Sequence, residues 1–329
     1  MKSIQIRNGH IIVAVIALLA LFILVTGSWG WYLAQPGPLK QESYVVIKSG
    51  SSVGGIARVL KKSQVIENEK LFRIAVWLMR LQTSLQAGEY QFGPAISLRT
   101  IVNKIATGDT IKREITLPEG LTVLEMMEKI EKLPFDVKND DLAEIPEGTL
   151  YPDTYDYQYG GSLSQFIQRL QKRMEKELQS AWSLRISNLP LASPNELLIL
   201  ASIVEKETSV PSERARIAGV FINRLNKGMK LQSDPTVIYG ASDYAGDLKA
   251  VHLKENHPYN TYVHKGLPPT PIANPGREAL IATAQPENHD YFYFVASGEG
   301  GHVFSKTYQE HLQNVARYLK IYRQKHGRK

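Results

Sequence analysis

Two glutamates, Glu205 and Glu207, lie in a stretch of sequence that offers them few polar neighbours. The stretch opens with Ser193, Pro194 and Glu196, which are typical of an N-cap, a first-turn proline and the third-position acid of a capping box. The residues that follow are apolar on nearly every face of a helix. A helix of this kind is normally buried, and burial raises the pKa of a carboxyl group. Either glutamate could therefore act as a general acid near neutral pH.

A structural interpretation of the same pair is also open. One or both glutamates could form ion pairs with Arg214, Arg216 or Arg224 of the next helix and so close the two helices together. Helical spacing alone does not separate the two carboxylates. Glu207 is the first choice for an acid only by the resemblance described below, and Glu205 is the second.

The segment downstream of these helices gathers polar groups. A second helix is expected to end near Gly228. Asn223 lies on one flank of this helix, beside the end of the first helix, where Glu207 is expected. Residues 231–240 then read LQSDPTVIYG, and Pro235 prevents them from forming a simple helix interior. We expect this segment to line a polar cleft.

Several ordered motifs resemble one protein family. The chain has EKET at 205–208, VFINRL at 220–225, DPTVIYG at 234–240, YNTY at 259–262 and GLPP followed by NPG within 266–276. Together these motifs resemble the YceG/MltG family of endolytic murein transglycosylases, from about Thr149 to the end of the C-terminal helix. In that family the second glutamate of the EKE triplet is the catalytic acid, and it corresponds to Glu207 here.

The resemblance implies a specific reaction. A lytic transglycosylase cleaves the β-1,4 bond between N-acetylmuramic acid and N-acetylglucosamine without water, and it limits the elongation of nascent glycan strands. The muramoyl C6 hydroxyl attacks C1 and leaves a 1,6-anhydro end, which makes the enzyme a carbon-oxygen lyase. Glu207 would give its proton to the leaving oxygen and then accept the proton of the C6 hydroxyl. This chemistry needs no cofactor.

Tyrosine rings stack on sugar faces, and amides and small polar groups bond sugar hydroxyls. By residue type and motif position we expect substrate contacts from nine residues, among which Gln232 and Asp234 would stabilise a developing positive charge. They are Tyr151, Asp153, Asn223, Gln232, Asp234, Thr236, Tyr239, Asn260 and Tyr262. The tyrosines between 151 and 159 alternate with period 2, which is equally typical of a half-buried strand.

The N-terminal part contains an uncharged apolar run at residues 11–33. At about 1.5 Å per residue this run is long enough to cross a hydrocarbon core of roughly 30 Å. Trp29, Trp31 and Tyr32 lie where an interfacial aromatic belt is expected. We predict a transmembrane helix at 11–33, with a cleavable signal peptide as the alternative.

The charges around this run predict its orientation. Lys2 and Arg7 precede it, and Lys40 is the first charge after it. The positive-inside rule then places residues 1–10 in the cytoplasm and the rest outside. We expect a single-pass protein of the cell inner membrane whose catalytic part is periplasmic or extracytoplasmic. The chain has no cysteine, which excludes a lipoprotein, a disulfide framework and thiolate catalysis.

Residues 43–112 are predicted to form a LysM-like domain, and residues 113–329 the catalytic domain. The start of the first resembles a LysM glycan-binding module, which the family carries at this place, although Gly54 and Gly55 weaken its first helix. Its alternative role is a spacer. A strand, a glycine turn and a helix occur twice at a constant offset, and a related unit spans 90–105. The aligned residues are Ile47, Gly50, Val53, Ile56 and Ala57 with Leu117, Gly120, Val123, Met126 and Met127.

The expected fold class is α+β, with a transmembrane helix, small LysM-like α/β modules and a larger α+β catalytic domain. A hairpin is expected from 291–295 and 302–304, followed by a C-terminal helix. The 329 residues carry a net charge of +7, which suits anionic wall polymers or lipid headgroups and is equally typical of a basic solvated surface, and no motif for nucleic acid is present. The histidines of the last third lack metal-ligand spacing, so no metal is expected.

Two other functions remain open at this point. One is a water-using glycosidase in which Glu205, Asp153 or Asp234 is a second carboxylate. The other is a non-catalytic scaffold that binds the wall. The expected partners are peptidoglycan strands and the membrane. The family resemblance adds penicillin-binding proteins and the elongation machinery, for which no residue pattern marks a site.

Overall fold

The computed structural model describes residues 16–18, 20, 21, 24, 26–135, 144–242 and 244–327. Part of the predicted transmembrane helix, residues 11–15, 19, 22, 23 and 25, lies outside them. Over the described ranges, no helix combines the length and the apolar character needed to span a bilayer. The mixed α and β content agrees with the expected class, and the chain divides into two compact units between Arg113 and Glu114.

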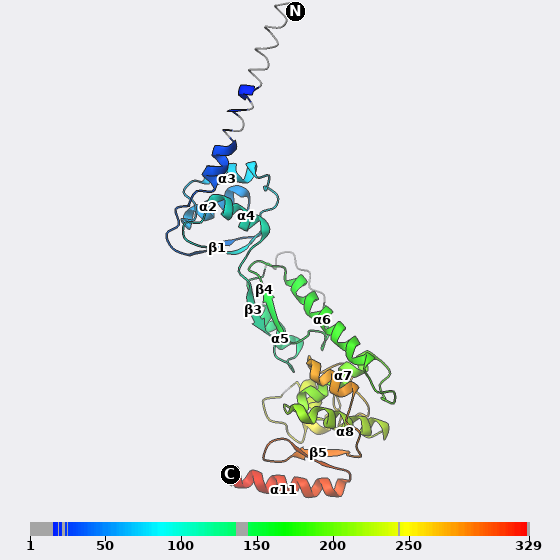
Figure 1. The fold of residues 1–329 in the computed structure, drawn as a ribbon. Helices are drawn as coiled ribbons and strands as arrows, with labels where there is room; N and C mark the ends of the chain where they lie inside the picture. Colours follow the sequence, from blue (N-terminus) through cyan, green and yellow to red (C-terminus); the bar gives the residue numbers. More distant parts are fainter. Residues whose placement is uncertain are drawn as a thin grey trace, which may run out of the picture. The chain divides into compact units, whose positions relative to one another are not determined.

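Of the described residues, the first unit contains those up to Arg113 together with 134, 135 and 156–162 (Figure 1). Its two-stranded sheet pairs β1 (Ser43–Ile47) with β2 (Gly88–Phe92) in antiparallel register, with Val45 opposite Tyr90. The helices α2 (Val53–Lys62), α3 (Glu69–Leu78) and α4 (Leu98–Thr107) bury their apolar faces in the same core as the sheet.

The repeated strand, turn and helix is confirmed. Gly50 and Gly120 both have positive φ, 73° and 75°, which a glycine adopts without steric cost. Two residues later, Ser52 and Thr122 both cap a helix by accepting a hydrogen bond from a first-turn N–H group. The predicted third unit is also present, because Ser97 caps α4 after strand β2.

The remaining elements follow in sequence, mostly in the second unit. The strands β3 and β4 form one two-stranded sheet, and β5 and β6 form the predicted hairpin with Phe294 opposite Phe304. The elements are β3 (Arg113–Thr116), α5 (Val123–Ile130), β4 (Thr154–Tyr157), α6 (Leu163–Ser183), α7 (Pro194–Glu207), η1 (Pro211–Glu213), α8 (Arg214–Asn226), α9 (Asp234–Gly240), η2 (His252–Lys254), α10 (Arg277–Ala284), β5 (Tyr293–Ala296), β6 (His302–Ser305) and α11 (Tyr308–His326).

Helix α7 is the centre of the second unit's core. It packs against α6, α8, α9 and α10, and the side chains of Leu200 and Ile203 are fully buried. Ser193 caps it by accepting the N–H group of Glu196 at 3.3 Å. The carboxylate of Glu196 accepts the N–H group of Ala192 at 2.7 Å. In the predicted capping box the donor would be the N–H group of Ser193.

Candidate active site

Glu207 is the last residue of α7, and the chain leaves the helix at Thr208, which is extended with φ −146° and ψ 134°. The turn before it is fully buried at Ile203 and Val204, whereas Glu207 itself is partly exposed. The carboxyl group thus stands at the point where a core helix meets solvent. A substrate could reach it there while the core excludes water from its other side.

Ser233 is the hydrogen-bond partner of Glu207. Its hydroxyl donates to Oε1 of Glu207 at 2.5 Å, although Ser233 occupies the N-cap position of α9, where a serine oxygen usually accepts from the helix. The buried Ser233 is fixed by its backbone. Its N–H group donates to Oγ1 of Thr261 at 3.0 Å, and its carbonyl accepts from Thr236 at 2.7 Å. The hydroxyl is therefore held in place for the carboxyl group.

The turn that delivers Ser233 is unusual. Gln232 has a positive φ of 49°, which is uncommon for a residue with a Cβ atom, and its N–H group donates to the carbonyl of Thr261 at 3.1 Å. The side chain of Gln232 is exposed. Two of the predicted contact residues, Gln232 and Thr236, lie before and after Ser233 in the sequence. Thr236 is fully buried, and its hydroxyl is hydrogen-bonded to that of Thr261 at 2.8 Å.

Burial raises the pKa of Glu207 from 4.5 to about 7. The hydrogen bond from Ser233 acts in the opposite direction, because it stabilises the carboxylate. The negative charge of Asp234 raises the pKa further, and the positive charge of Arg224 lowers it. A carboxyl group with such a pKa can both donate and accept a proton near neutral pH.

Asp234 and Tyr262 form a second polar pair near Glu207. The Tyr262 hydroxyl donates to Oδ1 of Asp234 at 2.6 Å. Burial raises the pKa of Tyr262, and the charges of Asp234 and Glu207 raise it further. Asp234 is exposed, so its carboxylate is available to solvent and to a ligand.

Arg224 is buried and does not pair with either glutamate of the triplet. Its guanidinium donates to the carbonyl of Leu231 at 2.6 Å and to that of Phe292 at 2.7 Å. Burial lowers its pKa. The side chain thus fixes the backbone just before Ser233 and places a positive charge behind Glu207.

Glu205 has the structural role that the sequence left open. Its side chain is only 5% exposed, its Oε1 lies 3.3 Å from Nη2 of Arg214, and its Oε2 accepts the N–H group of Gly276 at 3.0 Å. The predicted ion pair with the next helix is therefore confirmed for Glu205. The carboxylate ties α7 to α8 and to the start of α10.

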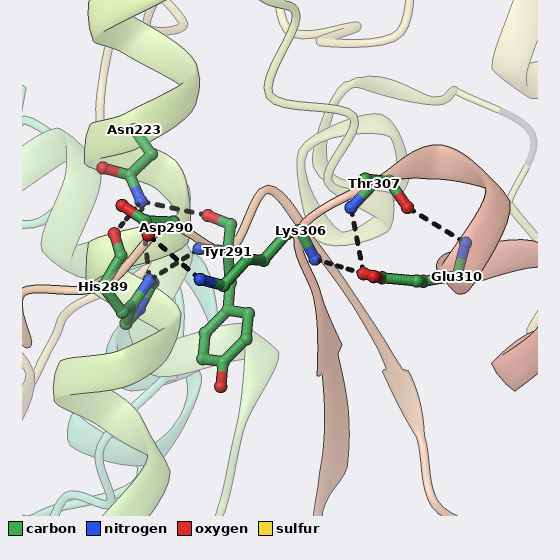
Figure 2. A network of polar contacts seen from close by, with 7 residues as sticks. All are labelled: Asn223, His289, Asp290, Tyr291, Lys306, Thr307 and Glu310. Atoms are coloured by element: carbon green, nitrogen blue, oxygen red, sulfur yellow. Dashed lines mark hydrogen bonds and ion pairs between the residues drawn. The ribbon is translucent and has the colours of Figure 1, made fainter.

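The two asparagines among the predicted contact residues hold backbone. Nδ2 of Asn223 donates to the carbonyls of His289 at 2.8 Å and Tyr291 at 3.0 Å, and Figure 2 shows the amide directed at this segment. Asn260 is fully buried and donates to the carbonyls of His252 and Glu255. In both side chains the amide nitrogen thus holds neighbouring backbone in place.

The network of Figure 2 continues from Asn223 to the base of α11. Lys306 forms an ion pair with Asp290 at 3.0 Å, next to the segment that Asn223 holds. The backbone N–H group of Lys306 donates to Glu310, the third-position acid of the α11 capping box. The predicted hairpin and C-terminal helix are thereby joined to α8 by polar contacts.

Tyr239, Tyr151 and Asp153 occupy other environments. The hydroxyl of Tyr239 donates to Glu147 at 3.2 Å. Tyr151 is buried in the core beneath Arg173, and the tyrosine alternation produces a strand only at 154–157. Asp153 is exposed and accepts the N–H group of Thr154 at 2.7 Å.

Sequence reasoning missed the specific roles of Ser233 and Thr261. A serine directly before Asp234 and Pro235 is an N-cap signal, and this pattern hides the donation to Glu207. In the described ranges 26–135, 144–242 and 244–327, no three carboxylates or histidines are grouped as ligands of a metal ion.

The sequence model of the YceG-like family matches residues 45–317 of this chain. The chain belongs to the YceG-like family. It is 33% identical to the endolytic murein transglycosylase of Bacillus subtilis strain 168, over 83% of this chain and 84% of that protein. It is 27% identical to the protein of that name from Streptococcus pneumoniae serotype 2 strain D39, over 94% of this chain and 66% of that protein.

A solved structure shares the fold. The crystal structure of a YceG-like protein from Listeria monocytogenes aligns with a TM-score of 0.50 and 32% identity, over 83% of this chain and 99% of that one. The resemblance of the sequence motifs to this family is therefore confirmed, and the α+β class of this YceG-like chain is shared with a relative.

The raised pKa of Glu207 predicts a dependence of stability on pH. Because the folded pKa of about 7 lies above the unfolded 4.5, the unfolded chain releases this proton first, and stability falls as pH rises between these values. Relative to a Glu207→Gln variant, we expect the YceG-like chain to lose on the order of 2–3 kcal/mol over this range. Thermal unfolding of both proteins at pH 4.5 and at pH 7.5 measures the difference. If the difference in melting temperature between the two proteins is the same at both pH values, this expectation is contradicted.

Proposed function

We propose that this chain is an endolytic murein transglycosylase that cleaves the β-1,4 bond between N-acetylmuramic acid and N-acetylglucosamine with formation of a 1,6-anhydro end. The observation that carries the proposal is the placement of Glu207 at the exit of a buried helix, with a pKa raised to about 7 and a fixed hydroxyl at 2.5 Å. The names of the relatives from Bacillus subtilis and Streptococcus pneumoniae support it.

A single carboxyl group is sufficient for this reaction. Protonated Glu207 gives its proton to the glycosidic oxygen as the bond to C1 breaks. The resulting carboxylate is stabilised by the Ser233 hydroxyl and by the charge of Arg224. It then takes the proton of the C6 hydroxyl as that oxygen bonds to C1, which returns Glu207 to its starting state. No water is consumed.

A nearby negative group can stabilise the positive charge that develops on the sugar ring. Asp234 is exposed and close enough to Glu207 to raise its pKa. Its orientation is fixed by the Tyr262 hydroxyl at 2.6 Å. We assign Asp234 the stabilisation of the oxocarbenium-like transition state, and Tyr262 the positioning of Asp234.

The water-using alternative needs a second free carboxylate. Glu205 is bonded to Arg214 and to the Gly276 N–H group, which argues against it as that carboxylate. Asp153 bonds its own neighbouring backbone. Asp234 is the remaining candidate, so the chemistry of the product distinguishes the two mechanisms.

The proposed location follows from the sequence. A helix at 11–33 would anchor the chain in the cell inner membrane, with residues 1–10 in the cytoplasm and the catalytic part outside. The LysM-like region at 43–112 follows the anchor and precedes the catalytic part in the sequence. Penicillin-binding proteins and the elongation machinery are the proposed neighbours.

Endolytic cleavage is tested by the length of the products. We expect the purified full chain to shorten long, newly polymerised glycan strands by internal cuts, so that the mean length falls before short fragments accumulate. Chromatography of the strands over time measures this. Early release of disaccharides while the remaining strands shorten only gradually would indicate an exolytic enzyme, and no products with no change in length would favour the wall-binding scaffold.

The neighbours of Glu207 predict opposite changes in the pH profile. Activity should fall as pH rises through about 7, because the acid step requires the protonated form. Ser233→Ala removes a bond that lowers the pKa, so this limb should move to higher pH, and Asp234→Asn should move it to lower pH. Each displacement is expected to reach up to about one pH unit. Initial rates between pH 5 and pH 9 measure the displacement. If activity falls at the same pH in all three proteins, the roles assigned to Ser233 and Asp234 are contradicted.

A further inference from the structure

Helix α3 of the first unit has an outer face that combines apolar and basic side chains. Its inner side is fully buried at Phe72, Ala75 and Val76. The opposite side leaves large apolar groups in solvent, with Trp77 66% and Leu78 44% exposed. We call this surface the α3 outer face, and it comprises Lys70, Arg73, Ile74, Trp77 and Leu78 together with Arg80 just after the helix.

The charge of the α3 outer face is entirely positive. Lys70, Arg73 and Arg80 are exposed, and none of them forms an ion pair with a carboxylate within the part of the chain that the structure describes. The single acid of the helix, Glu69, lies 4.0 Å from Lys61. Unpaired basic groups beside an exposed tryptophan are typical of a helix that lies in the interface of an anionic bilayer.

The α3 outer face is next to residues 26–33, the end of a helical segment that we call the N-terminal helix, and the last turn of this segment is its foot. Leu71 of α3 lines a hollow with Trp29 and Trp31, and Trp31 is 68% exposed. Leu33 is buried in the core of this unit, which fixes the foot of that helix against it. Figure 1 shows α3 beside the helical segment that ends at this point.

We infer that the α3 outer face lies on the surface of an anionic lipid bilayer, beside the point where the N-terminal helix leaves the membrane. The aromatic side chains of residues 29–32 belong at the interfacial level. The hollow at Leu71 brings α3 to the same place. Trp77, Ile74 and Leu78 would enter the boundary between headgroups and acyl chains, and the three basic groups would bind the lipid phosphates.

This contact would fix the first unit at the bilayer. The charge complementarity selects lipid over glycan for this face, because glycan recognition by an apolar tryptophan surface does not require three unpaired cations. The inference relies on the proposed membrane anchor, and its failure can be told apart from failure of the anchor.

The absence of cysteine from the chain allows a direct test, because one introduced cysteine is the only labelling site. Leu78→Cys carries an environment-sensitive fluorophore in the full chain, reconstituted into vesicles of phosphatidylglycerol and phosphatidylethanolamine. The matched control is Val59→Cys on α2 of the same unit, which is 38% exposed. We expect a blue-shifted emission at 78 and quenching by nitroxide lipids several-fold greater than at 59.

A triple substitution Lys70→Gln, Arg73→Gln and Arg80→Gln should reduce the quenching at 78 several-fold on these vesicles and change it little on phosphatidylcholine. If the protein floats with the vesicles while the label at 78 is as water-exposed as at 59, the inference is overturned and the anchor stands. If the protein does not float, both are rejected. Burial of the label only on addition of peptidoglycan would also overturn the inference, in favour of glycan binding.

Discussion

Replacing Glu207 by glutamine should lower the rate of glycan cleavage by a factor of about a hundred to ten thousand, the range that a general acid contributes. The amide keeps the shape of the side chain and can still accept the hydroxyl of Ser233, which lies 2.5 Å from Oε1 in the parent. It cannot donate a proton to the glycosidic oxygen. The initial rate of new chain ends, measured on long glycan strands, gives the factor.

The stability of the Glu207→Gln variant shows whether a loss of activity comes from the missing proton donor or from unfolding. Glutamine removes a carboxyl group whose ionisation opposes folding, because burial raises its pKa to about 7. The melting temperature of Glu207→Gln at pH 7.5 should therefore equal or exceed that of the parent. A variant that melts normally and still cleaves within about threefold of the parent rate would exclude Glu207 as the acid.

Replacing Glu205 by glutamine should produce the reverse pattern, with lost stability and retained chemistry. The substitution leaves Arg214, only 12% exposed, without its partner at 3.3 Å, and the remaining carboxylate of Glu119 lies at 3.6 Å and is 42% exposed. Removing one member of a buried ion pair costs about 3–5 kcal/mol, and we expect on the order of 2–4 here because Glu119 remains. Native-state hydrogen exchange of α7 and α10 measures the loss.

An exposed ion pair of the same unit supplies the control. Glu287 pairs with Arg216 at 2.9 Å, and both side chains are more than a third exposed. Glu287→Gln should cost less than about 1 kcal/mol. Equal losses of stability for Glu205→Gln and Glu287→Gln would contradict the structural role of Glu205. A folded Glu205→Gln protein as inactive as Glu207→Gln would instead identify Glu205 as a second carboxylate.

Local signals predicted the elements that position the site. The cap at Ser193, the proline at 194 and the apolar helix after it depend on neighbouring residues, and α7 forms where they indicate. The repeated strand, turn and helix can be predicted for the same reason, because each glycine turn and each helix cap depends on residues that are close together in the sequence. The pair Gly54 and Gly55 weakens a helix start by propensity, yet α2 begins at Val53 because the Ser52 cap and core packing outweigh that cost.

The distinction between Glu205 and Glu207 is a tertiary property. Gly276, which bonds Glu205, lies 71 residues away along the chain, and periodicity carries no information about it. The amide of Asn223 shows the same limit. Its residue type suits a sugar, whereas His289, 66 residues away along the chain, supplies a carbonyl that holds it.

The central proposal is that one carboxyl group cleaves the glycan without water. Mass spectrometry of products formed by the full chain in water labelled with heavy oxygen tests it most directly. We predict 1,6-anhydro-N-acetylmuramic acid ends that contain no label, because the C6 hydroxyl of the sugar closes the ring. Reducing ends that carry the label would contradict the single-carboxyl mechanism and would give Asp234 the activation of water.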